Sequence, residues 1–402
     1  MRVLEGVRVV EWGEFVSAPY CGRILAGLGA EVVKVETPGS GDEARLHGPF
    51  PNDQPNPEAS GLFLHLNVGK RGVTLDPAKP EGLALFRRLL SETDILVTNY
   101  RPSQVEALGL GPEDLLALNP RIIAATVTPY GWTGPYRNLP GCDLTVLALA
   151  GVSFSVGEPD REPLTPPYFM SDYQAGLTAA SAIMTALFAR EDTGRGQHVD
   201  IAAFEPWATY HAGATVTTFV YQGVTGHRDG RRRPDLYPYT LLPCKDGLLC
   251  LIAREGRQWK RFLVDVMQRE DLADHERYRK RRVVAEEYPE EMDALLSPWL
   301  MERTREEIFE LCRKHRVPFA PVRRIDEVLN DPHLAERGFF RTIDHPVAGS
   351  LPYTGAPFQM SETPWSMHSA APTLGEANEE VFGVRLGCSK EALNALQLSS
   401  VI

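Results

Sequence analysis

The sequence predicts an α/β protein built around a parallel sheet. Short Val-rich segments recur through the first half of the chain, and helical segments separate them, so that a strand, a helix and a strand fit within about thirty residues. The 402 residues suffice for a large hydrophobic core and suggest two or more domains. The composition, 43% hydrophobic and 24% charged, is ordinary for a globular protein.

The first strand–helix–strand unit opens the chain. Val7–Trp12 is a short apolar run, and Tyr20–Leu28 is typical of a helix that ends before Gly29, where a glycine cap is favoured. Glu31–Glu36, with the sequence EVVKVE, is the next expected strand. Elements in this order form a βαβ unit, whose two strands are parallel.

The same alternation continues to about residue 221. We expect strands at Gly72–Leu75, Ile95–Thr98, Arg121–Val127 and Gln197–Ile201, and helices at Pro80–Glu92, Pro112–Ala117, Tyr173–Arg190 and Ala202–Tyr221. This succession predicts a doubly wound architecture, with helices on both faces of the sheet.

The composition and the pattern of the sequence change after residue 222. Residues 223–234 are rich in Gly and Arg and are expected to form a flexible loop or linker. Tyr239–Cys244 and Leu248–Ala253 flank Lys-Asp-Gly, which predicts a hairpin, and a charged helical region follows. We therefore take residues 223–334 as a second, smaller α/β domain.

Charge, hydropathy and cysteine usage exclude several classes of protein. The net charge of −11 argues against a nucleic-acid binder and against binding to an anionic membrane surface. No apolar run approaches the roughly 20 residues that span a bilayer, and the opening MRVLEGVRVVEW lacks a signal-peptide pattern. The six cysteines include no CxxC pair, so we expect reduced thiols in the cytoplasm, without disulfides and without a metal site.

The turn after the first strand, GEFVSAPY, holds one glycine, so the dinucleotide fingerprint G-x-G-x-x-G is absent and an NAD enzyme is disfavoured. Candidate donors to an anionic ligand instead follow several expected strands. Ligands of open α/β sheets bind at the carboxyl ends of the strands, and phosphates need cationic or N–H donors there. The alternative, a set of solvated surface charges, stays open. The candidates are Arg45, Lys70, Arg71, Asn99, Tyr100 and Arg101.

Asp172 carries the sharpest chemical signal in the sequence. It lies just before the expected helix Tyr173–Arg190, between aromatic and small residues. The helix dipole and backbone N–H groups would keep its carboxylate ionised and able to attack a carbonyl carbon. The alternative is that Asp172 only caps the helix, which is a common role for aspartate.

A family resemblance rests on segments that occur in a fixed order. They are LEGVRVVEWGEFVSAPYCGRILAGLGAEVVKVETPGSGDEAR, NVGKRGVTLD, DILVTNYRPSQVEALGL, LNPRIIAATVTPYGWTGPYRNLPGCDL, SDYQAG, TGRGQHVDIA, YPYTLLPCKDG and PTLGEANEEV. With these segments the chain resembles the family III CoA-transferases, which include formyl-CoA:oxalate, carnitine and bile-acid CoA-transferases. The resemblance covers nearly the whole chain.

The resemblance implies a role for individual residues. Asp172 matches the family's catalytic aspartate, and Asp143 matches an acidic position near the active site of several relatives. Val16 and Ser17 match the loop that faces the thioester and pantetheine. The positions implied to contact coenzyme A are Lys70, Asn99, Tyr100 and Arg101, with Arg45 beside them.

The resemblance also implies an architecture and a substrate. A large Rossmann-like domain is expected to combine residues 1–222 with a return segment, 335–402, and the small domain 223–334 is inserted between them. Two such chains are expected to interlock as a homodimer. Coenzyme A and acyl-CoA enter as substrates together with small carboxylic acids, and no tightly bound cofactor is expected. The Gly223–Gly230 loop corresponds to one that shields intermediates.

Two other functions stay open at this point. The α-methylacyl-CoA racemases share the fold and epimerise the carbon next to the thioester by proton transfer. Their pattern places a histidine where this chain has Cys142, and a thiol is a poor substitute at neutral pH. The other alternative is a non-catalytic acyl-CoA-binding protein, against which the retained Asp172 argues.

Overall fold

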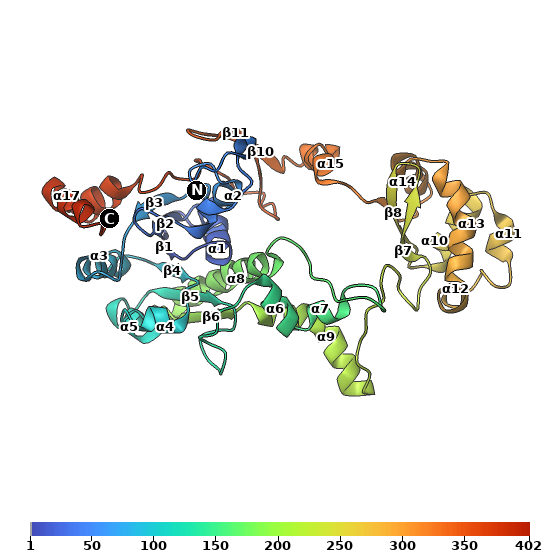
Figure 1. Cartoon of the computed structure of the whole chain (residues 1–402), viewed down its shortest axis with the longest axis horizontal. Helices are drawn as coiled ribbons and strands as arrows, with labels where there is room; N and C mark the ends of the chain where they lie inside the picture. The colour runs from blue at the N-terminus through green and yellow to red at the C-terminus, as the bar shows by residue number, and fades with distance from the viewer. Residues whose placement is uncertain (1) are drawn as a thin grey trace. The chain divides into compact units, whose positions relative to one another are not determined.

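The computed structural model describes residues 2–402, except for the side chains of residues 210–215. The chain divides into two compact units (Figure 1). The large unit comprises Met1–Val152, Pro166–Thr217 and Pro332–Ile402, and the small unit comprises Ser153–Thr165 and Thr218–Asp331.

A six-stranded sheet with all strands parallel forms the centre of the large unit. Its strand order is β3-β2-β1-β4-β5-β6, and Val9 in β1 pairs with Val32 on one side and Ile95 on the other. This topology confirms the predicted α/β class. The strands are β1 Arg8–Trp12, β2 Glu31–Glu36, β3 Arg71–Thr74, β4 Ile95–Thr98, β5 Ile123–Thr128 and β6 His198–Ala202.

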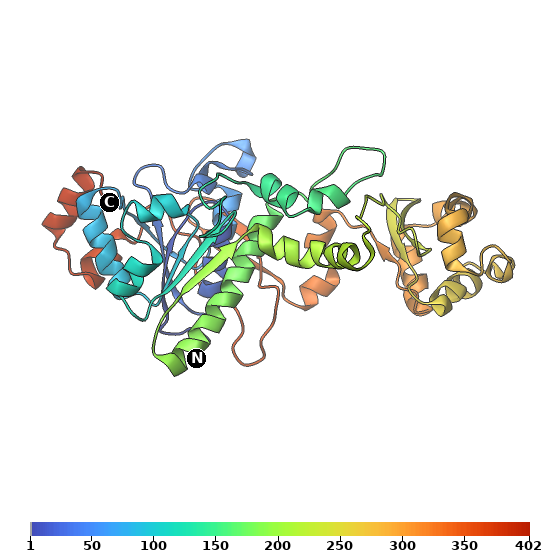
Figure 2. The ribbon, with the colours of Figure 1, turned by 90° about the horizontal axis from the view of Figure 1, so that it is seen from below.

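Helices cover both faces of this sheet and create two hydrophobic cores. On one face, α1 (Ser17–Gly27) and the 24-residue α8 (Met170–Thr193) pack against the strands, as Figures 1 and 2 show. On the other face lie α3 (Pro80–Ser91), α5 (Pro112–Leu118) and the C-terminal α17 (Lys390–Leu398). The residues of the C-terminal segment therefore complete the large unit.

Several short elements of the large unit escape sequence-based prediction, because five to seven residues show too little periodicity. The stretch 339–364 contains an antiparallel hairpin. The remaining elements of the large unit are α2 Gly61–Asn67, α4 Pro102–Glu106, α6 Asp143–Leu149, α16 Pro332–Glu336, β10 Phe340–His345, β11 Gly349–Thr354, and short helical segments at Glu43–Leu46, Pro51–Asp53 and Glu379–Arg385. Helices α7 (Val152–Ser155) and α9 (Phe204–Gln222) each begin in the large unit and end in the small one.

The small unit combines a three-stranded antiparallel sheet with short helices around its own hydrophobic core. The predicted hairpin is confirmed as β7 (Tyr239–Cys244) paired with β8 (Gly247–Ile252), and the preceding glycine-containing stretch forms no helix or strand. The other elements are α10 Gly256–Arg261, a π-helical turn at Phe262–Val266, α11 Glu270–Asp274, α12 Arg281–Glu287, α13 Pro289–Met301, α14 Arg305–Lys314, β9 Ala320–Pro321 and α15 Ile325–Leu329. No helix among the described residues is both long and apolar enough to traverse a bilayer.

The strand order reverses between β1 and β4. Chain connections leave these neighbouring strands in opposite directions, an arrangement at which a crevice beyond the carboxyl ends is expected. In open α/β sheets this switch point is the usual place for a ligand. The segments that follow β1 and β4 therefore flank the expected ligand site.

A cluster of buried charges lies beside this switch point. The Lys34 ammonium is 3.1 Å from Glu11 and 2.7 Å from Asp42, and it donates a hydrogen bond to the Gly13 carbonyl at 3.1 Å. Burial opposes its charge, but attraction to Asp42 and Glu11 raises the pKa of Lys34 overall. The Asp42 carboxylate also accepts the N–H of Phe15 at 2.9 Å. Lys34 and Asp42 therefore fix the loop between β1 and α1.

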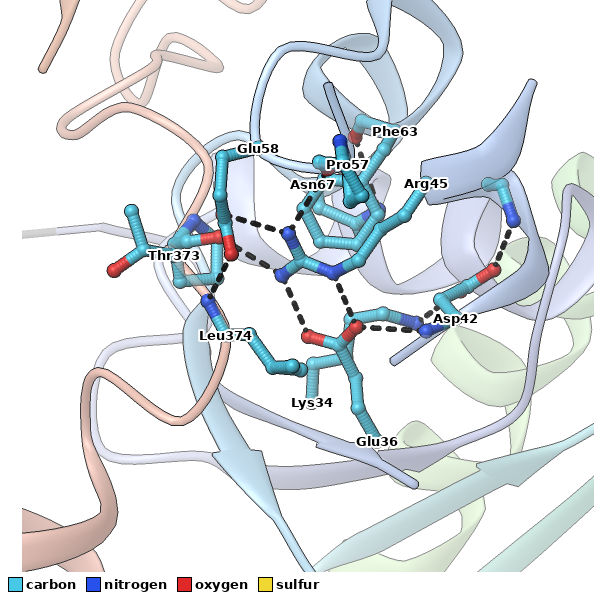
Figure 3. A network of polar contacts seen from close by, with 12 residues as sticks. Lys34, Glu36, Asp42, Arg45, Pro57, Glu58, Phe63, Asn67, Thr373 and Leu374 are labelled. Atoms are coloured by element: carbon cyan, nitrogen blue, oxygen red, sulfur yellow. Dashed lines mark hydrogen bonds and ion pairs between the residues drawn. The ribbon is translucent and has the colours of Figure 1, made fainter. Parts of the chain in front are cut away.

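Arg45 anchors the adjoining loop, as Figure 3 shows. Its guanidinium binds both oxygens of Glu36, at 2.7 and 3.0 Å, and reaches Glu58 at 2.8 Å. The Arg45 side chain also lies over the Phe63 ring, 3.6 Å from its centroid. Such bidentate pairs hold two segments at a defined distance.

Replacing Lys34 with methionine leaves Asp42 without its cation and Glu11 with Lys70 alone. We expect Lys34→Met to lower the free energy of unfolding by about 3–5 kcal/mol, because breaking a buried ion pair leaves an uncompensated charge. Arg71→Met is the matched control, since it removes an exposed pair with Glu380 and should cost less than about 1 kcal/mol. Urea unfolding measures the free energy of unfolding of both variants. A loss for Lys34→Met as small as that for Arg71→Met would contradict this role of Lys34.

Candidate active site

Asn99 joins the two segments that flank the switch point. Its amide nitrogen donates to the Glu14 carbonyl at 2.7 Å and to Ser17 Oγ at 3.1 Å, and its amide oxygen accepts the Glu14 N–H at 2.9 Å. A Cβ atom on Gly13 would stand 2.6 Å from that amide oxygen, so the close approach requires glycine. The Asn99 amide thus holds the loop, and Ser17 begins α1 beside it.

The Tyr100 hydroxyl donates a hydrogen bond to the Glu14 carboxylate, and its ring packs 4.7 Å from that of Trp12. Burial raises the pKa of Glu14, although the hydrogen bond from Tyr100 opposes the rise. Glu14 was not a sequence-based candidate. The position of Glu14 in the first strand–helix turn could have indicated a role in the site. The neighbouring sequence gives no sign of its tyrosine partner, which lies 86 residues away.

The structure corrects the interpretation of the segment around Asp172. Helix α8 begins at Met170, so Asp172 lies inside the first turn, and the alternative that it caps the helix is wrong. The capping acceptor is Asp143, whose Oδ1 accepts the Ser171 N–H at 2.7 Å and the Ser171 hydroxyl at 2.6 Å. Asp143 therefore holds the start of the helix that carries Asp172.

The Asp172 side chain is half-buried and makes no hydrogen bond within the part of the chain that the structure describes. Burial raises the pKa of Asp172 to about 7, and repulsion by Asp143 contributes to the rise. Gly176, one turn later, explains its position: a Cβ there would lie 2.5 Å from the Ser17 carbonyl oxygen. The first turns of α8 and α1 therefore lie against each other.

The predicted contacts to coenzyme A separate into two groups. Val16, Ser17, Asn99, Tyr100 and Arg101 gather at the switch point, although the Val16 side chain is fully buried. Lys70 and Arg45, by contrast, are buried cations that serve the protein itself. Lys70 lies 2.7 Å from Glu11 and donates to the Pro19 carbonyl at 2.8 Å, and burial lowers its pKa to about 8 despite Glu11.

Arg101 is the remaining cation of the predicted set. It precedes α4, is half-buried, and its guanidinium donates to Gln104 at 3.3 Å. Among the described residues its side-chain partner is the neutral Gln104, and it forms no ion pair. Its charge is therefore available to an anionic ligand at the carboxyl end of β4.

Fold and site together define a class: an α/β protein whose parallel sheet reverses its strand order between β1 and β4, with an unpaired, half-buried carboxylate in the first turn of the neighbouring helix α8. A family model described as CoA-transferase family III matches residues 4–378. The chain belongs to this family, which confirms both the resemblance and the predicted class of enzyme.

Individual relatives agree with this assignment. The succinate–glutarate CoA-transferase of Agrobacterium fabrum is 32% identical over 383 residues, covering 94% of each chain. The succinyl-CoA–D-citramalate CoA-transferase of Chloroflexus aurantiacus is 33% identical, covering 100% of this chain and 98% of its own. A crystal structure of a CAIB/BAIF family protein from Brucella suis has a TM-score of 0.85 at 29% identity, covering 96% of this chain and all of that one.

The arrangement of Asp143 and Asp172 predicts the pH dependence of the enzyme. If ionised Asp172 is the reactive form, kcat/KM for CoA transfer rises with pH through about 7, the pKa of Asp172. Asp143→Asn removes the repelling charge while keeping an acceptor for Ser171, so this rise should move to lower pH. Ser171→Ala is the control, because it removes a hydrogen bond without changing charge. An unmoved profile in Asp143→Asn contradicts the coupling.

Proposed function

We propose that this enzyme transfers coenzyme A from an acyl-CoA donor to a carboxylic acid, with the Asp172 carboxylate as covalent nucleophile. One observation carries the proposal. The carboxylate of Asp172 is half-buried and has no hydrogen-bonding partner in the described protein, and it lies in the first turn of α8, which packs against the first turn of α1. A carboxylate kept free of partners is suited to attack a carbonyl carbon.

The reaction proceeds through four exchanges at carbonyl carbons. An Asp172 oxygen attacks the donor thioester, the C–S bond breaks, and a mixed anhydride and CoA thiolate result. The thiolate attacks the aspartyl carbonyl, which releases the donor acid and leaves an aspartyl-CoA thioester. The acceptor carboxylate then attacks this thioester, and the thiolate finally takes the acyl group of the acceptor. The thioester bond energy is retained throughout, so no ATP is needed.

The helix starts around Asp172 support the anionic stages of this reaction. Among the described residues no side chain caps α1, so the N–H groups of Ser17 and Ala18 are available to an oxyanion. The dipoles of α1 and α8 both direct their positive ends toward the crevice. Desolvation strengthens these interactions, because the local dielectric constant is low.

Coenzyme A binding is assigned to the crevice residues. Arg101 is the proposed partner of a CoA phosphate, and Ser17 with the backbone of Val16 faces the thioester. Asn99 and Tyr100 act by holding the loop around Glu14. Arg45 and Lys70 act from within the protein by fixing the loops that bear these groups.

The substrates follow from the relatives. Those described above act, by their names, on succinate, glutarate and citramalate, with succinyl-CoA as the named donor of the second. We propose succinyl-CoA as the donor and a dicarboxylic acid as the acceptor.

A homodimer is proposed as the assembly. Helix α9 exposes the apolar side chains of Val216, Phe219 and Val220, with 54%, 56% and 70% of their surface accessible in the single chain. A second copy of the chain would remove this apolar surface from water.

Asp172→Asn tests the proposed mechanism, because an amide neither attacks a thioester nor accepts the CoA group. We expect transfer from succinyl-CoA to glutarate to fall at least about 10⁴-fold, while the dissociation constant for CoA changes less than about threefold. Mass spectrometry follows transfer, and calorimetry follows binding. Wild-type enzyme treated with hydroxylamine during turnover should carry a hydroxamate on Asp172.

Near-normal turnover by Asp172→Asn contradicts the nucleophile. Exchange of the α-proton of the acyl group for solvent deuterium, without any need for an acceptor acid, would instead support an isomerase. The controls are the thermal melting curves of both proteins, which should show equally folded chains.

A further inference from the structure

Two phenylalanine rings contact each other at the start of the helix that carries the proposed nucleophile. Phe15 comes from the loop after β1 and Phe169 from the residue before α8, and their ring centroids lie 4.7 Å apart at an angle of 77°. The ring centroid of the exposed His47 lies 5.0 Å from that of Phe15. Phe169 is the residue before α8 and Asp172 is the third residue of that helix, so their backbones lie within one turn of each other.

The backbone is strained at both phenylalanines. Phe15 has φ of 66° and Phe169 has φ of 56°, in the left-handed region that favours glycine and disfavours bulky side chains. Tyr168 shares this conformation, with φ of 63°. Residues in this region persist only where surrounding contacts hold them, and they concentrate at functional sites.

Identified contacts maintain this strained geometry. The buried Asp42 carboxylate accepts the N–H of Phe15, and Asp143 fixes Ser171, two residues after Phe169. Glycine at either position would relieve the strain but would remove a ring. In two separate loops, therefore, a phenylalanine adopts an unfavourable backbone conformation, and the two rings contact each other.

We propose that the Phe15–Phe169 pair is a water-excluding wall beside Asp172 that decides whether its covalent intermediates are transferred or hydrolysed. This inference rests on the proposed function. Both rings are half-buried, and their apolar edges offer no hydrogen bond to an attacking water molecule. Asp172 owes its altered acidity first to burial, which agrees with an apolar wall nearby.

The reaction that the wall suppresses is hydrolysis of the aspartyl-CoA thioester. The oxygen of water forms a bond to the aspartyl carbonyl carbon, the C–S bond breaks, and its electron pair leaves with sulfur. One proton of the water goes to the thiolate and the other to solvent, which gives free CoA and the Asp172 carboxylate. The acceptor acid competes with water for the same carbon, so exclusion of water favours transfer.

Phe169→Gly removes one ring of the wall and relieves its strain. Tyr168→Gly is the matched control, because it relieves the same backbone strain at the preceding residue, whose side chain is 81% exposed. The readout is the ratio of succinyl-CoA hydrolysis, measured as free thiol without acceptor, to transfer with acceptor. We expect a rise of about tenfold in Phe169→Gly and none in Tyr168→Gly.

Phe169→Leu keeps an apolar side chain and should give an intermediate ratio, which guards against misfolding of the glycine variant. Equal ratios of hydrolysis to transfer in all three variants and wild type would overturn the proposed role of the wall, even if hydroxylamine still traps Asp172. Absence of the Asp172 adduct in a wild-type enzyme that transfers CoA would overturn the proposed function instead.

Discussion

The buried contact of Lys34 with Glu11 and Asp42 is the interaction on which the site depends. One ammonium group pairs with a carboxylate on β1 and another on the loop after β2, and also binds the carbonyl of Gly13. Charges removed from water at this cost are retained only with close and complete pairing. That requirement fixes the relative positions of the end of β1, the loop after β1 and the loop after β2.

Two kinds of carboxylate follow from this arrangement. Glu11, Glu36 and Asp42 are buried with cations at hydrogen-bonding distance, so their charges are neutralised within the protein. Asp172 is desolvated without such a partner, and Asp143 repels it. The first kind stabilises structure, whereas the second retains a high-energy charge that a bond to an acyl carbon relieves. The structural carboxylates are thus paired with cations, whereas the carboxylate proposed to react is not.

Much of the fold is predictable from local pattern, and the site only in part. The strands of the large sheet and helix α8 are long or apolar enough to identify in the sequence. Arg45 and Lys70 are assigned to a ligand by sequence but lie inside the protein, because the burial of a cation depends on partners such as Glu36 and Glu11 that folding brings near. The capping role of Asp143 is hidden for the same reason, since Ser171 lies 28 residues away.

The most direct test of the account follows oxygen atoms through wild-type enzyme. With succinyl-CoA as donor and glutarate labelled with ¹⁸O in its carboxylates as acceptor, the fourth exchange leaves an acceptor oxygen on the aspartate. Mass spectrometry of the peptide that contains Asp172 should therefore show one ¹⁸O atom in that side chain after a single turnover and up to two after many, and succinate released in later turnovers should carry label. Full transfer with no ¹⁸O in Asp172 would contradict a covalent role for this carboxylate.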